Sequence, residues 1–155
     1  MPTTFNVISL GNFASIDPTE GNIQSENAAS LVGQTFGGVG VSLLNDIQSF
    51  STGSTGFGGG NTSAYDMNNS ASNEAFSING GPDQVFDGTA LYNATITYID
   101  GTTATITAVV FQDSAGNTYL SPEFSANPDQ PSLEAGAIRS LGLDSLVGNH
   151  YSGLT

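Results

Sequence analysis

Acidic and amide side chains recur in turn-rich segments of this chain, where their oxygen atoms could ligate a hard cation. Calcium prefers several such ligands, drawn from carboxylates, amides and backbone carbonyls. The sequence therefore predicts calcium as a cofactor. The candidate metal ligands are Asp17, Glu20 and Asn22 in an early segment, Asp83 and Asp87 around a hairpin, and Asp113 and Asn117 in a later turn.

A structural role is the alternative for each of these residues. Asp and Asn side chains also hydrogen-bond the backbone of their own turns, which makes them common there without any metal. None of the segments matches the spacing of an EF-hand loop. Both interpretations stay open at the level of sequence.

Residues suited to catalysis are scarce by comparison. His150 is the only histidine and cysteine is absent, which excludes a zinc site of several imidazoles and thiolate chemistry. Glu74, Glu123 and Glu134 lie near predicted strand ends, where paired carboxylates could hydrolyse a glycosidic bond, but no spacing marks a pair. The sequence therefore predicts a protein that is not an enzyme.

The charge balance limits the partners more sharply. Fourteen acidic residues face a single cation, Arg139, so the formal net charge is -13. Such a chain cannot neutralise phosphates, which excludes nucleic acid and an anionic membrane surface as partners. No apolar run approaches the roughly 20 residues of a membrane-spanning helix, so membrane insertion is not expected. Arg139 itself is expected to pair with a carboxylate.

The composition indicates a single β-domain over residues 1–155, secreted or displayed at the cell surface. Apolar residues make up 37% of the chain and charged residues only 10%, so uncharged Ser, Thr, Asn and Gly supply most of the polar surface. The N-terminus lacks the features of a signal peptide, which favours a signal-less route such as type I secretion. Residues 151–155 do not resemble a natural domain end, which indicates a fragment of a longer protein.

Alternation of apolar and polar residues predicts the strands. Residues 90–99 and 102–111 alternate on either side of Asp100-Gly101, which predicts an antiparallel hairpin with a type I′ turn, one apolar face and one threonine-rich face. The predicted fold is all-β, an antiparallel β-sandwich whose jelly-roll or immunoglobulin-like topology stays open. At most one short helix is expected, near residues 25–32, with Gly33 at its left-handed end.

The segment from Thr95 to Asp113, followed by Gly116 to Glu123, resembles a module of large secreted proteins from marine alphaproteobacteria. There the module is an N-terminal β-domain ahead of a hedgehog/intein-type (Hint) autoprocessing domain or of RTX-type calcium-binding repeats. The resemblance implies signal-less secretion, a calcium-rich exterior and a surface or matrix role. It carries over no catalytic residue, because this chain lacks the Hint cysteine and the RTX nonapeptides.

Together these features predict a non-enzymatic extracellular structural or interaction module. Its partner would be further copies of itself, assembled with calcium into a filament or surface layer, because the sheet edges carry no lysine to oppose pairing. A calcium-dependent carbohydrate-binding module is the alternative, with Phe57, Tyr65 and Tyr151 as candidates for stacking on an extracellular glycan. A polysaccharide-active enzyme is the second alternative.

Overall fold

Antiparallel β-structure dominates the computed structural model, which describes residues 4–16, 25–38, 42–52, 75–121 and 129–148. The all-β prediction is thereby confirmed. The strands are β1 (Thr4–Asn12), β2 (Thr35–Gly37), β3 (Ile47–Thr52), β4 (Ala75–Ile78), β5 (Asp83–Tyr98), β6 (Thr103–Asp113), β7 (Asn117–Leu120) and β8 (Ile138–Gly148). Short helical turns lie between them: the 3-10 helices η1 (Ala14–Ile16), η2 (Ala28–Leu31) and η3 (Leu43–Asp46), and the α-helix α1 (Asp129–Glu134).

The predicted hairpin is formed by β5 and β6. The two strands pair in register from Ala90 opposite Val110 to Thr97 opposite Thr103. Successive side chains of a strand point to opposite faces of the sheet. The alternating pattern therefore buries one face of the hairpin and leaves its threonines on the other.

The turn between β5 and β6 differs from the predicted type I′. That turn needs positive φ at both central residues, yet among the described non-glycine residues positive φ occurs at Asn79 and not at Asp100. Gly101, with a φ of 88°, donates its N–H to the Tyr98 carbonyl at 2.9 Å. The loop is therefore a type I turn that ends in a left-handed glycine.

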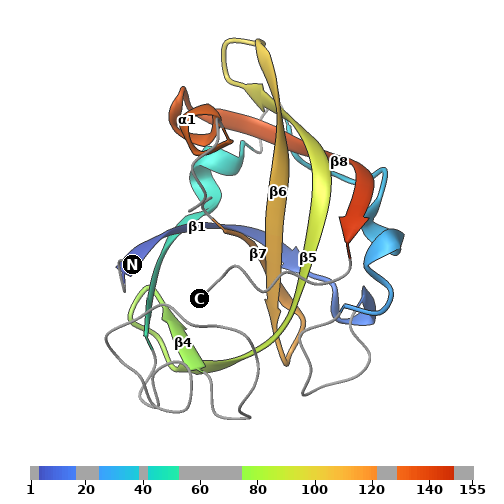
Figure 1. Ribbon diagram of the computed structural model, residues 1–155. Helices are drawn as coiled ribbons and strands as arrows, with labels where there is room; N and C mark the ends of the chain where they lie inside the picture. The colour runs from blue at the N-terminus through green and yellow to red at the C-terminus, as the bar shows by residue number, and fades with distance from the viewer. Residues whose placement is uncertain (1–3, 17–24, 39–41, 53–74, 122–128, 149–155) are drawn as a thin grey trace.

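Six of the strands close into a ring. The pairs run β1–β3, β3–β4, β4–β5, β5–β6, β6–β7 and β7–β1, so every strand of this cycle has two neighbours. Beyond the ring β8 pairs with β5, and β2 pairs with β8 (Figure 1). All eight strands thus belong to one continuous sheet, and the predicted sandwich of two sheets is not confirmed.

Ring closure protects part of the strand edges without any lysine. A closed sheet has few free edges, and a very short outer strand offers little backbone for another chain to pair with. β2, the outer strand beyond β8, has three residues. On the sides away from β5, β6 pairs with β7 only at 110–112 and β8 pairs with β2 only at 140–142, so among the described residues these two strands keep partly unpaired edges.

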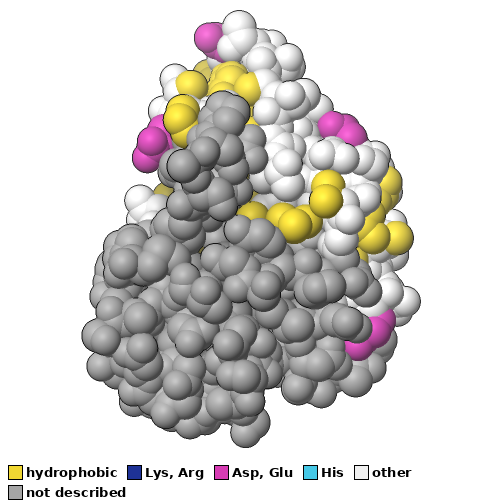
Figure 2. Space-filling model, in the orientation of Figure 1, with side chains coloured by type: hydrophobic (Ala, Val, Ile, Leu, Met, Phe, Trp, Pro, Cys, Tyr) yellow, Lys and Arg dark blue, Asp and Glu magenta, His cyan; other side chains and the backbone are white. Residues whose placement is uncertain are grey.

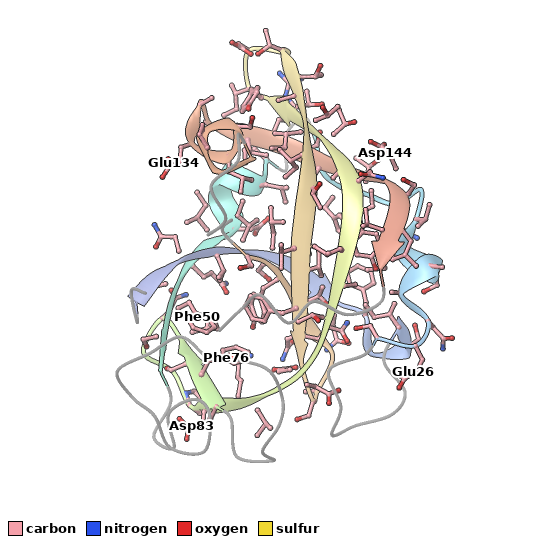
Figure 3. The ribbon with its side chains drawn as sticks, viewed as in Figure 1. Glu26, Phe50, Phe76, Asp83, Glu134 and Asp144 are labelled. Atoms are coloured by element: carbon pink, nitrogen blue, oxygen red, sulfur yellow. The ribbon has the colours of Figure 1, made fainter. Side chains whose placement is uncertain are left out.

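Aromatic side chains fill the inside of the ring. Phe50 of β3 and Phe76 of β4 stack at 5.1 Å between ring centroids, and both contact Phe111 of β6 edge to face. Tyr119 of β7 completes the cluster, stacked on Phe111 at 5.3 Å. Figure 3 shows Phe50 and Phe76 in the space that the ring encloses. These contacts come from four strands, so they hold the cycle closed.

A second apolar cluster lies on the opposite face of β5, β6 and β8. Tyr92, Ile96 and Leu141 are fully buried there, beneath side chains contributed by the 3-10 helices. The Tyr92 hydroxyl donates a hydrogen bond of 2.8 Å to the Ala28 carbonyl in η2. The short helices thus act as a cover for the sheet rather than as a separate layer.

The helical segments agree with the prediction only in part. η2 lies inside the expected range, and Gly33 follows it with a φ of 89°. The helix α1 lies outside the range near residues 25–32 in which a short helix is expected. Pro131 lies in the first turn of α1, where backbone N–H groups have no partner within the helix and a proline costs little.

Replacing Phe76 tests the aromatic cluster. Phe76→Ala should lower the free energy of unfolding by about 3–5 kcal/mol, because it leaves a cavity among three aromatic rings. Urea unfolding followed by circular dichroism measures this loss. Val85→Ala, at a residue that is 39% exposed, is the control and should cost less than about 1 kcal/mol. Equal losses in the two variants would contradict the assignment of the cluster as the core of the ring.

Alkaline titration tests the buried phenols. Burial raises the pKa of Tyr92, and burial also raises the pKa of Tyr119, which lies beside Asp113. Because the folded state holds both phenols neutral, their contribution to stability is complete below the unfolded pKa of about 10 and is lost as the pH rises above it. Ultraviolet absorbance should show both ionising together with unfolding, and Tyr119→Phe should remove one phenol from that late phase. Reversible ionisation of both phenols in a folded protein would contradict this.

Candidate functional site

The outward face of β2, β8, β5 and β6 carries hydroxyl and amide side chains in rows across the strands. We call this surface the polar grid. Each of its residues is exposed or half-buried. Its members are Thr35, Asn93, Thr95, Thr97, Thr103, Thr105, Thr107, Ser140, Gly142, Asp144 and Ser145.

Strand register aligns these residues in two directions. Neighbouring strands lie roughly 4.8 Å apart, and alternate residues of one strand lie roughly 6.7 Å apart. Polar groups therefore repeat across the strands and along them. The rows contain Thr35, Gly142, Thr95 and Thr105; then Ser140, Thr97 and Thr103; then Ser145, Asn93 and Thr107.

Hydrogen bonds within the grid fix its longer side chains. The Thr95 hydroxyl donates to Oδ2 of Asp144 at 2.7 Å, and the Asn93 amide donates to the Ser145 hydroxyl at 2.8 Å. A shallow hollow of about 280 Å³ lies beside them. It is lined by Asn93, Ala94, Thr105, Ile106, Thr107 and Asp144.

Gly142 leaves a gap beside Asp144. Its φ lies outside the left-handed region, so the backbone does not require glycine here. A Cβ at this position would meet Oγ1 of Thr35 at 3.8 Å and Oδ1 of Asp144 at 4.0 Å, which is ordinary contact, so packing does not require glycine either. A glycine inside a strand often marks a place where a ligand or another backbone comes close.

The grid carries one acid among its eleven residues, about the same share as the whole chain, in which 14 of 155 residues are acidic. Asp144 is its one charged member. Figure 3 shows Glu26, Asp83 and Glu134 at other parts of the molecular outline, and in Figure 2 the surface over the upper part of β5 and β6 is mostly white. The exposed acids that the structure describes off the grid are Glu26, Asp46, Asp83, Asp100 and Glu134.

Two of the predicted metal ligands, Asp113 and Asn117, come together inside a turn. Oδ1 of Asp113 accepts the backbone N–H groups of Ala115 and Asn117, at 3.0 and 2.8 Å. Oδ2 accepts the side-chain amides of Gln84 and Asn117, at 2.7 and 2.8 Å. With four donors on a buried carboxylate, Asp113 organises the β6–β7 turn, as in the structural alternative.

Of the other predicted ligands, the two that the structure describes, Asp83 and Asp87, do not form a metal-binding group with Asp113. Asp87 is buried at a bulge of β5 next to the pairing of Phe86 with Asp113, whereas Asp83 is exposed at the start of the strand. The described residues contain no group of three or more histidine, cysteine or acidic side chains that could hold a metal ion. Asp17, Glu20 and Asn22 lie outside the described residues. Calcium binding stays a prediction.

Arg139 supports the hairpin loop. Its guanidinium donates to the Ile99 carbonyl. The pKa of Asp100 is lowered chiefly by hydrogen bonds from the side chain and backbone of Thr102, and Arg139 adds a smaller electrostatic effect. Arg139 thus interacts electrostatically with the carboxylate of Asp100, whereas its direct hydrogen bond is to the Ile99 backbone.

A larger groove of about 400 Å³ lies between β1, β2 and η3. Its floor includes the core residues Leu10, Phe36 and Leu43, and Asp46 is its acidic member. No cluster of polar groups comparable with the grid lines it. We assign no chemistry to this groove.

No family model, curated protein or solved structure matches the chain. The resemblance of residues 95–123 to secreted proteins with Hint or RTX regions therefore stays a prediction. Among the described residues, no helix is long and apolar enough to cross a bilayer. The polar grid is the feature from which a function can be argued.

Substituting Asp113 separates a structural role from a metal site. Asp113→Ala removes the acceptor of four hydrogen bonds and should lower the free energy of unfolding by about 2–4 kcal/mol. Because these donors belong to the protein, the loss should be the same in millimolar calcium and in chelator. Thermal unfolding in both buffers measures it. A loss confined to calcium-containing buffer would instead identify Asp113 as a calcium ligand.

Proposed function

We propose that this protein is a non-enzymatic extracellular interaction module that binds a glycan through the polar grid. The observation that carries the proposal is the regular array of hydroxyl and amide groups on one sheet face, with a single carboxylate among them. Sugar hydroxyls both donate and accept hydrogen bonds. Threonine, serine and asparagine side chains do the same, so the two surfaces are chemically complementary.

Charge favours a neutral glycan. At a net charge of -13 the protein repels carboxylated and sulfated polymers unless cations intervene. A neutral polysaccharide meets no such repulsion, and the grid presents it with one carboxylate among uncharged groups. The same repulsion opposes the approach of two copies, so self-assembly has weaker support than glycan binding.

The composition of the grid also argues against a protein as its main partner. Stable protein interfaces have cores enriched in aromatic residues, methionine and arginine. The grid instead consists of hydroxyl, amide and carboxylate side chains and a glycine, with no aromatic residue, methionine or arginine among its members. Phe57, Tyr65 and Tyr151, the expected stacking residues, lie outside the described residues and play no part in the proposal.

Catalysis is a poorer match to this surface than binding. Hydrolysis of a glycoside uses two carboxyl groups separated by roughly 5–10 Å across the scissile bond. Asp144 is the single acid of the grid, and Glu134 lies on α1, off the grid. Secretion or surface display remains the setting of the proposal, with the chain acting as a module that attaches.

Affinity electrophoresis tests the proposed function. The protein should be retarded in gels containing neutral hydroxyethylcellulose, galactomannan or laminarin, and should migrate normally in gels containing alginate. Retardation should persist in chelator, because the grid groups bind directly, and no new reducing ends should appear. Normal migration in all the neutral gels, with calcium and with chelator, would contradict the proposal.

The same samples test the assembly hypothesis. Sedimentation velocity with millimolar calcium and with chelator should show a monomer in both, since the net charge of -13 opposes the approach of two copies. Large particles that form in calcium and dissolve in chelator would favour the filament or layer.

A further inference from the structure

Resting on the proposed function, we infer that Asp144, Asn93 and Gly142 form a saccharide subsite within the polar grid, which takes an uncharged sugar through two neighbouring hydroxyls. The rest of the grid then extends contacts to adjoining sugar units.

Asp144 is held in place by its neighbour. The Thr95 hydroxyl donates to Oδ2 at 2.7 Å, which sets the plane of the carboxylate before any ligand binds. The other oxygen, Oδ1, lies 4.0 Å from the point that a Cβ on Gly142 would occupy. A carboxylate oxygen is a strong acceptor for a sugar hydroxyl, because hydrogen bonds to an ionised group are about twice as strong as neutral ones.

Gly142 lets a sugar lie close to the strand, because a gap about the size of a methyl group takes the place of a Cβ. Neither the backbone nor the packing requires glycine at this position, and the missing side chain opens the grid between Thr35 and Thr95. A sugar seated over this gap can approach the backbone of β8 closely. The missing side chain therefore gives this row a local depression, in which a ligand can come close to the backbone.

The hollow on the other side of Asp144 supplies the second hydroxyl contact. Asn93 lines it together with Thr105, and the Asn93 amide is oriented by its bond to Ser145. The Asn93 carbonyl oxygen can accept from a hydroxyl, and the Thr105 hydroxyl can donate or accept. Carboxylate and amide thus flank the space in which two adjacent sugar hydroxyls would lie.

Charge sets the specificity of the subsite. A carboxylated or sulfated sugar would place its negative group against Asp144, and like charges at such distances repel. A neutral sugar gains an ionic hydrogen bond at the same place. The subsite should therefore select neutral sugars even within mixed extracellular polymers.

Variants at two positions test the subsite, with binding to the best neutral polymer measured by titration calorimetry. Asp144→Asn keeps the shape and removes the charge, and it should weaken binding about tenfold or more. Gly142→Val fills the gap with a residue that favours strands, so it should abolish measurable binding without lowering the thermal midpoint. Val85→Ala, at an exposed position of β5 that lies outside the polar grid, is the control and should bind within about twofold of the wild type.

The possible outcomes distinguish a failure of the subsite from a failure of the proposed function. Losses in Asp144→Asn and Gly142→Val, with Val85→Ala unaffected, support the subsite. Wild-type affinity in both test variants overturns the subsite and leaves glycan binding by the grid intact. Failure of the wild-type protein to bind any neutral polymer overturns the proposed function and the subsite together. Preferential binding of alginate by Asp144→Asn alone would support the charge selection.

Discussion

The pairing of β5 with three other strands is the constraint on which the rest of the structure depends. β5 is 16 residues long, and it meets β4 at its start, β6 along most of its length and β8 towards its end. The first two pairings belong to the ring, and the third extends the sheet beyond it. One strand thus joins the closed part of the molecule to the open face that carries the polar grid.

The two faces of β5 and β6 serve different purposes because side chains alternate along each strand. The buried face supplies Tyr92 and Ile96 to the main core, and the opposite face supplies the threonines of the grid. A shift of register by one residue would exchange these faces and bury the hydroxyls. The energy of the core therefore fixes the positions of the polar groups as well.

The β5–β6 hairpin could be predicted from sequence because its signal is local and periodic. The ring could not, because its closure depends on β1 meeting β3 and β7 across long separations in the sequence. β3 was not predicted, because Ile47–Thr52 lies among glycine-rich segments and its apolar and polar residues do not alternate strictly. The turn chemistry was mistaken for a similar reason: Asp100-Gly101 fits two hairpin loops, and the register selects one.

The polar grid was visible in the sequence only in its threonines. Ser140, Gly142 and Asp144 belong to a segment whose alternation is interrupted by the irregular pairing of β8 with β5, so sequence did not place them beside Thr95. The predicted calcium residues show the converse problem. Asp113 and Asn117 are close together as expected, but their oxygen and nitrogen atoms bond mainly to one another and to the backbone of the turn.

Threonine also reduces the conformational entropy that the grid would lose when it binds a partner. Its branched Cβ restricts χ1, and a strand fixes the backbone beneath it, so the hydroxyl directions are largely set in the free protein. A partner that matches them immobilises few rotatable bonds and loses little conformational entropy on binding. Lysines or glutamates on the same face would have to be ordered first. Because its side chains are stiff, a threonine-rich sheet can discriminate between partners by their shape.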